Sequence, residues 1–239
     1  MKNEDNKPED ESRRNFLKLM GVITVGAASV GALRGVIQNV IPPVSNVLTA
    51  FPVLTLVDSS GKPITTKDLK VNDPAIVTFL YPLQGEPNFL LRLGNSSNTD
   101  IAIKPVTVKI PINGSTFKSP RGVGPYASVV ASSAICQHLG CEPPMIHFYP
   151  PSAASFPGKI HCSCHGSTYD PFSGFSVVTG PTQRPLPSTI LSYDSTSDTY
   201  KVTSMVGPTI YGKPSDLTGA TKLPSSTGTT VTNSGVPST

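Results

Sequence analysis

Two short stretches determine how this chain is interpreted: Cys136-Gln137-His138-Leu139-Gly140-Cys141 and His161-Cys162-Ser163-Cys164-His165-Gly166-Ser167. Together they contain all four cysteines of the 239 residues and three of the four histidines. Two cysteines and two histidines are enough to hold a metal centre. The two cysteines that remain are enough for one disulfide bond.

The spacing within each stretch indicates which kind of metal centre to expect. Cys136 and His138 project from the same side of an extended or tightly looped backbone, and Cys162 and His165 lie three apart, as on the two sides of a tight turn. Zinc fingers usually pair cysteine with cysteine and histidine with histidine, whereas each stretch here mixes the two. Mixed loops suit a two-iron cluster in which one iron takes both thiolates and the other takes both imidazoles. A structural zinc site and two structural disulfides remain as alternatives, although two disulfides would give the histidines no role.

The two stretches resemble the two boxes of Rieske iron–sulfur proteins, Cys-x-His-x-Gly-Cys and Cys-x-Cys-His-Gly-Ser. The resemblance implies one 2Fe–2S cluster as the cofactor. It makes Cys136 and Cys162 ligands of one iron, and His138 and His165 ligands of the other. The two histidine ligands would also be the catalytic residues.

The family pattern extends the site beyond the ligands. The resemblance implies a disulfide bond between Cys141 and Cys164, which separates the respiratory type from the ferredoxins of ring-hydroxylating dioxygenases. Ser167 and Tyr169 take the places of two hydroxyl donors that bond the cluster sulfurs in high-potential relatives and raise the potential. The residues expected to cover the cluster are Leu139, beside the docking surface, and Gly180 and Pro181, in the proline loop.

Some features depart from the family pattern or lie outside the expected ligand set. The segment from Glu142 to Ile160 is longer than in the mitochondrial type, and Gln137 stands where threonine is common. His147 lies in an apolar, strand-like run and His161 merely precedes a ligand, so neither is assigned a ligand role.

Composition predicts an all-β protein. Charged residues make up 14% of the chain, while Pro (25) and Gly (20) are abundant, as in folds with many turns. The net charge is +4, and the sequence has no cluster of basic residues with interleaved aromatics. This argues against nucleic acid as a partner. The predicted strands are 51–57, 75–80, 101–110, 127–134, 190–193 and 200–205.

The resemblance organises these strands into domains. It implies an antiparallel β-sandwich base domain with an inserted cluster-binding subdomain, which we place at about 132–186 within a Rieske domain over 50–212. Residues 213–239 are rich in Ser, Thr and Gly and nearly lack large apolar side chains, so they are predicted to form a flexible tail.

The N-terminal part predicts export and a membrane anchor. Ser12–Lys18 matches the twin-arginine pattern, which places residues 1–18 in the cytosol and the head on the extracytoplasmic side. An apolar run over 19–41 follows, and a transmembrane helix needs about 20 residues. The prolines that open residues 42–49 would end this helix and begin a neck. A cleaved signal peptide, cut near Ala32, is the alternative.

The leading functional hypothesis is an electron-transfer subunit of a quinol:acceptor oxidoreductase in the cell membrane of a prokaryote. The chain would take one electron from quinol, with a proton through His138 or His165, beside a cytochrome b subunit. It would pass the electron to a cytochrome or copper protein. The alternative is the Rieske small subunit of a molybdenum oxidase such as arsenite oxidase.

The scarcity of carboxylates suggests an acidic working compartment, as in an archaeal acidophile. Asp and Glu together number 15 in the whole chain. Carboxylates paired in the folded state lose their contribution to stability as pH falls through their lowered pKa values, so a surface with few of them loses little.

Overall fold

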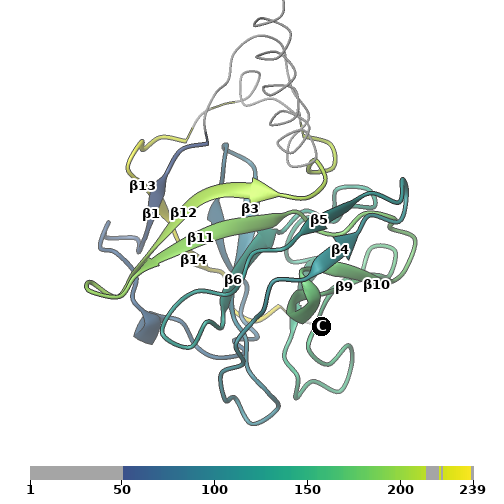
Figure 1. Cartoon of the computed structure of the whole chain (residues 1–239), viewed down its shortest axis with the longest axis horizontal. Coiled ribbons are helices and arrows are strands. Elements are labelled where there is room, and N and C mark those ends of the chain that lie inside the picture. Colours follow the sequence, from purple (N-terminus) through teal and green to yellow (C-terminus); the bar gives the residue numbers. More distant parts are fainter. Residues whose placement is uncertain (1–50, 214–220, 222, 238–239) are drawn as a thin grey trace, which may run out of the picture. The chain divides into compact units, whose positions relative to one another are not determined.

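The computed structural model describes residues 51–213, 221 and 223–237 (Figure 1). The twin-arginine motif, the predicted anchor over 19–41 and the predicted neck over 42–49 lie outside these residues. No helix in the described part of the chain is long and apolar enough to cross a membrane.

The described residues confirm the all-β prediction, because their regular structure consists of strands and short 3-10 helices. The elements in chain order are β1 (Leu54–Val57), η1 (Thr66–Asp68), β2 (Val77–Leu80), β3 (Pro87–Arg92), β4 (Thr107–Lys109), β5 (Thr116–Lys118), β6 (Val129–Ser133), β7 (Ile146–Tyr149), β8 (Lys159–Cys162), β9 (Ser167–Asp170), η2 (Pro171–Ser173), β10 (Ser176–Thr179), β11 (Ser188–Asp194), β12 (Thr199–Val206), β13 (Gly228–Thr230) and β14 (Thr232–Asn233).

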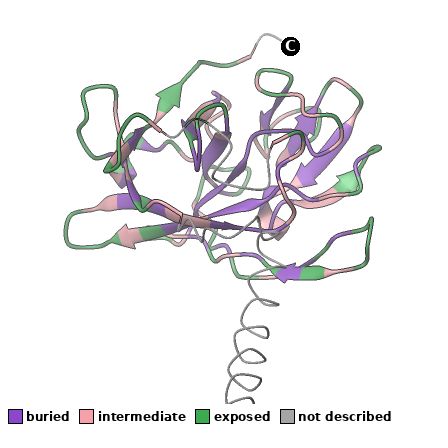
Figure 2. Ribbon diagram, turned by 90° about the horizontal axis from the view of Figure 1, so that it is seen from above, coloured by how far each residue is buried: buried purple, intermediate pink, exposed green. Residues whose placement is uncertain are grey.

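The larger sheet has the strand order β13-β1-β12-β11-β6-β3-β2-β14. Its pairs are antiparallel except for β1 with β13. Buried apolar side chains alternate along β12, as Tyr200 and Val202 show. The central strands β3 and β6 are instead buried on both faces. Figure 2 shows these buried residues lining the interior, while the connecting loops at the periphery are exposed. This sheet provides the rigid part of the domain.

A second sheet, β10-β9-β8-β7, is built from one continuous segment that lies between β6 and β11 in the sequence. Strands β6 and β11 are neighbours in the larger sheet, with Ser132 paired to Ser188. The chain therefore leaves the larger sheet after β6, builds the smaller sheet, and returns beside the point where it left. This insertion carries both cysteine–histidine stretches.

The prediction of a flexible tail over 213–239 is wrong for residues 223–237. Strand β13 pairs in parallel with β1, and β14 pairs with β2, so one short segment joins both edges of the larger sheet. Thr229 is buried, and its hydroxyl donates to the Leu80 carbonyl at 2.8 Å. Composition missed these strands because backbone pairing at a sheet edge needs few apolar side chains, and β-branched threonine favours it.

The strand predicted over 101–110 is also shorter than expected. Only Thr107–Lys109 is a strand, and it pairs with β5 in a separate hairpin. Pro105 has no N–H to donate, so a regular ladder cannot run through it. Tight turns lie at 58–62 and at 194–198, the second as the β11–β12 hairpin connection.

A partly buried ion pair predicts how stability depends on pH. Arg92 donates to both Asp100 oxygens, at 2.8 Å each, and these bonds hold the pKa of Asp100 below its ordinary value of 3.8. A carboxylate with a lowered folded pKa contributes stability above its unfolded pKa, and the contribution is lost as pH falls through the folded value. We therefore expect the contribution of this ion pair to the free energy of unfolding to stay nearly level from neutral pH to about pH 4 and to be lost below it.

The variant Asp100→Asn tests this expectation. It should lower the free energy of unfolding at neutral pH by about 2 kcal/mol, because bonds to a charged partner are lost. The variant should also reduce the loss of unfolding free energy that accompanies a fall in pH below about 4. Denaturant unfolding followed by circular dichroism measures both effects. Asp73→Asn is the control, since Asp73 forms no ion pair within the described residues. If stability below about pH 4 fell as steeply in Asp100→Asn as in the wild type, the role given to the Arg92–Asp100 pair would be contradicted.

Candidate metal centre

The two cysteine–histidine stretches form adjacent loops at one end of the smaller sheet. The first loop runs from β6 to β7, and the second is the tight turn between β8 and β9. In the first loop, the Gly140 N–H donates to the Cys136 carbonyl at 2.9 Å, and Gly140 has a positive φ of 81°. In the second, the Gly166 N–H donates to the Cys162 carbonyl at 2.9 Å, with φ of 84°. Glycine allows both loops to turn this sharply.

The loops bring the four predicted ligands to one place. Cys136 and Cys162 are free thiols, and both are buried. The rings of His138 and His165 meet edge to face, with their centroids 4.9 Å apart. His138 is half-buried and His165 is exposed. The thiol side of the site therefore faces the core and the imidazole side faces solvent.

A disulfide bond joins Cys141 to Cys164, which confirms the predicted pairing. Their Cα atoms are 6.9 Å apart, and the bond connects the two loops directly. Within the described residues, the only donor group close enough for one ion combines Cys162 with these two sulfurs, which are already bonded to each other. Cys136, Cys162, His138 and His165 do not gather round a single point, as donors to one zinc ion would.

The surroundings fit a cluster that lies between these donors. The His138 Nδ1 and the Ser167 Oγ are buried, and neither has a hydrogen-bond partner in the part of the chain described. A buried polar atom without a partner is costly, so these atoms are suited to an iron and to a cluster sulfur, respectively. Their placement supports Nδ1 as the coordinating atom of His138.

The segment after β10 packs against the second loop at Gly180, one of the two residues predicted to cover the cluster. A Cβ built on Gly180 would lie 2.5 Å from both the Gly166 carbonyl oxygen and the Ser167 Cα. Gly180 also has a positive φ of 95°. Only glycine allows this segment to pack directly against the second loop.

Tyr169 lies on the core side of the site and points its hydroxyl at a ligand. The hydroxyl accepts a bond from the Gln137 N–H at 3.0 Å and lies 3.3 Å from the Cys136 sulfur. With the Gln137 N–H donating to the oxygen, the phenolic proton is free to point at the sulfur. Hydrogen bonding from the Cys162 thiol, and then from Tyr169, lowers the pKa of Cys136 to about 5. The site thus favours a thiolate at Cys136, the form that binds iron.

Tyr169→Phe and Ser167→Ala should each lower the reduction potential of the cluster. Each change removes one bond to sulfur, and a bond to a charged acceptor contributes about 1.5–3 kcal/mol. For one electron this is roughly 60–130 mV. Potentiometric titration followed by EPR measures the shift, and Thr168→Val, in the same strand, is the control. An unchanged potential in both variants would mean that these hydroxyls do not bond the cluster.

The other two histidines belong to the packing of the smaller sheet. His147 and His161 are cross-strand partners in β7 and β8. The His147 Nδ1 lies 2.9 Å from the Pro144 carbonyl, and the His161 Nδ1 lies 2.9 Å from the Thr168 hydroxyl. Phe156 stacks on His161, with ring centroids 3.6 Å apart. The long segment between the two stretches therefore folds back over the sheet, a contact that the sequence pattern did not reveal.

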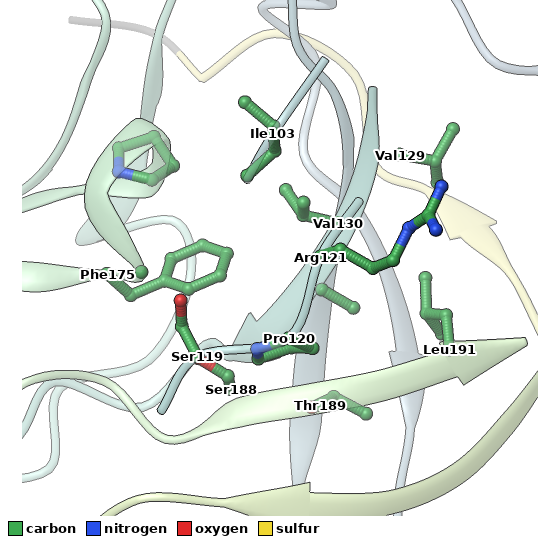
Figure 3. Close-up of a pocket in the computed structure, with 13 residues that line it drawn as sticks. Ile103, Ser119, Pro120, Arg121, Val129, Val130, Phe175, Ser188, Thr189 and Leu191 are labelled. Carbon is green, nitrogen blue, oxygen red and sulfur yellow. The ribbon is translucent and has the colours of Figure 1, made fainter. Parts of the chain in front are cut away.

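A small internal cavity lies away from this centre, where β6 and β11 meet the turn around η2 (Figure 3). Its volume is about 10 Å³, and its lining includes Phe175 and Ser188. A space of this size holds about one water molecule. It is too small for an organic substrate.

Comparisons with known proteins agree with this geometry. Residues 116–190 match the family model of the Rieske [2Fe-2S] domain, a range that includes both loops and the covering segment. The chain is 28% identical to the cytochrome b6-f complex iron-sulfur subunit 1 of a Nostoc species, over 74% of this chain and 76% of the relative. It is 29% identical to the cytochrome b6-f complex iron-sulfur subunit of Nostoc punctiforme, over 79% and 82%. Residues 116–190 of this chain form a Rieske [2Fe–2S] domain.

The cofactor of this Rieske domain is one [2Fe–2S] cluster. A similar solved structure is the soluble domain of the Rieske protein II from Sulfolobus acidocaldarius. It is 28% identical, covers 72% of this chain and 87% of that chain, and has a TM-score of 0.49.

Proposed function

We propose that this Rieske protein is the electron-transfer subunit of a membrane quinol-oxidising cytochrome b complex. The observation that carries the proposal is the asymmetry of the site, with buried thiols on one side and the exposed His165 on the other. The similarity to subunits named for the cytochrome b6-f complex supports the same assignment. A cytochrome b subunit would be the partner, and a cytochrome or copper protein the acceptor.

Different residues around the site have different roles in the proposed reaction. The bound cluster supplies a one-electron acceptor. The ring nitrogen of His165 that is not bound to iron accepts a hydrogen bond from the quinol hydroxyl and takes its proton. His165 suits this role better than His138, because it is more exposed. Cys136 is buried and stays closed to water. The Tyr169 hydroxyl stabilises the negative charge on the Cys136 sulfur by a hydrogen bond.

An apolar rim around the histidines is suited to docking in a membrane complex. The side chain of Leu139 is 54% exposed, and that of Met145 is 48% exposed. The Met145 carbonyl accepts bonds from Ser163, so this residue is held beside the second loop. We assign both side chains to the contact with the cytochrome b subunit around the quinol.

The remaining architecture is part of the same proposal. An uncleaved anchor over 19–41 would hold the protein in the cell membrane, with residues 50–212 on the extracytoplasmic side. The cluster-binding subdomain at about 132–186 would present the histidines, and the neck over 42–49 would let the head move between quinol and acceptor.

Leu139→Asp tests the proposal in membranes that contain the complete complex. We expect quinol oxidation to fall at least tenfold while the EPR signal of the cluster is retained, because a buried charge opposes docking by at least about 1.4 kcal/mol. Ile112→Asp is the matched control, since Ile112 is 52% exposed on the β4–β5 hairpin. Equal quinol oxidation in both variants would contradict the docking role. A mature protein cut near Ala32 and absent from membranes would contradict the anchor.

A further inference from the structure

One buried carboxyl group lies outside the ligand set. Glu86 is in the loop between β2 and β3, and only 3% of its surface is exposed. Its Oε2 has no hydrogen-bond partner within the described residues. An ionised carboxylate in such a place is costly, because it loses water without gaining a full set of donors.

Within the described residues, the groups that act on the Glu86 carboxyl are few. The ammonium of Lys213 interacts with its charge, and the Leu83 backbone donates to it. Lys213 lies beside the same loop, since its Nζ is 3.8 Å from where a Cβ on Gly85 would be. Tyr81 is buried at the start of the loop, where its N–H donates to the Glu86 carbonyl.

Lys213 also reaches the first cluster loop. Its Nζ lies 3.5 Å from the Glu142 Oε1. Glu142 directly follows the disulfide-bonded Cys141 in the sequence. The neighbouring Tyr211 ring lies 3.3 Å from where a Cβ on Gly140 would be. One ammonium therefore lies between a buried carboxyl of the base and an exposed carboxylate of the cluster loop.

The backbone around Glu86 is joined to a cluster ligand as well. The carbonyl of Pro87, the next residue, accepts a 2.8 Å bond from the Ala134 N–H. Ala134 lies two residues before Cys136. One backbone hydrogen bond therefore links the residue after Glu86 to the segment that carries Cys136. Charges interact more strongly through a low-dielectric interior than through water, and the coupling proposed below relies on this interaction.

We propose that Glu86 is a proton-binding group coupled to the redox state of the cluster, and that Lys213 tunes this coupling. When one electron enters from quinol or an electrode, the fraction of Glu86 carboxylates that hold a proton rises, and the proton comes from solvent. The partly exposed Lys213 and Glu142 mark the way to solvent. The inference rests on the presence of the cluster and not on the quinol reaction.

Electrostatics gives the direction of the effect. Burial raises the pKa of Glu86 to about 7, and Lys213 opposes the rise. The negative charge added on reduction raises this pKa further, so the reduced protein binds the proton more tightly. We expect a difference on the order of tenfold between the two redox states. By reciprocity, the potential falls as pH rises through the range in which Glu86 ionises.

Potentiometric titration of the holoprotein from about pH 5 to about pH 9 tests the proposal. We expect the wild-type potential to fall in a step near pH 7, and this step to be lost in the isosteric variant Glu86→Gln. Steps that arise from the histidine ligands should persist in that variant. Glu142→Gln is the matched control, because it removes an exposed carboxylate near the same ammonium. In Glu142→Gln the potential should shift by the same amount at every pH between about 5 and about 9, and the step near pH 7 should remain.

Lys213→Met provides a second, independent measurement. Removing the ammonium should move the Glu86 step to higher pH, and Lys213→Arg should restore its position. A Glu86→Gln curve identical to the wild type, or a step that does not move in Lys213→Met, would overturn the proposal. If the wild-type complex does not oxidise quinol but its potential still shows the Glu86 step, the proposed function is contradicted and the role of Glu86 is not.

Discussion

His165→Ala is expected to abolish the EPR signal of the cluster completely. The variant removes one of the two predicted nitrogen donors, and the exposed side of the site has no other histidine to replace it within the described residues. Mixed cysteine and histidine ligation produces the Rieske type of cluster, so losing a nitrogen donor removes its basis. The same result is expected for His138→Ala, Cys136→Ser and Cys162→Ser.

EPR of the reduced protein, together with iron and sulfide analysis, measures this outcome. His147→Gln is the matched control, because His147 lies in the same sheet but bonds the Pro144 carbonyl. Its signal should be retained at the level of the wild type. A Rieske signal that survives in His165→Ala would refute the assignment of this ligand.

The double variant Cys141→Ser/Cys164→Ser should leave a cluster that is far more labile. The disulfide bond joins residues that are 23 positions apart and connects the two loops covalently. In the chain-entropy model, closing a loop of this length contributes about 3 kcal/mol. If that free energy protects the loops from opening, the cluster should be lost roughly 100-fold faster, at about 1.4 kcal/mol for each tenfold change.

Loss of visible absorbance in the presence of an iron chelator measures this rate. Ser163→Ala, in the same turn as Cys164, controls for a general disturbance of the second loop. Treating the wild type with a reductant that opens the bond should reproduce the faster loss. Equal rates of loss in the double variant and the wild type would contradict a protective role for the bond.

The sequence predicted the centre itself because its chemistry is local. The spacing of Cys136, His138, Cys162 and His165 assigns each loop one thiolate and one imidazole, and few kinds of metal site use that pattern. The disulfide between Cys141 and Cys164 was likewise implied by the family pattern before its geometry was known. Turn-rich composition was sufficient to predict an all-β fold.

Contacts between distant segments could not be predicted in this way. Strands β13 and β14 join the two edges of the larger sheet, although their sequence is nearly free of large apolar side chains. Backbone hydrogen bonds carry almost no sequence signal, because every residue except proline can make them.

The sequence by itself therefore determined which side chains can hold a cluster and how the loops that carry them turn. Only the tertiary structure decided that His165 is exposed while the thiols are buried, and that Glu86 loses its solvent beside Lys213. The reason is that donor type belongs to a residue and its near neighbours. Burial and charge balance depend on which remote segments the fold packs against it.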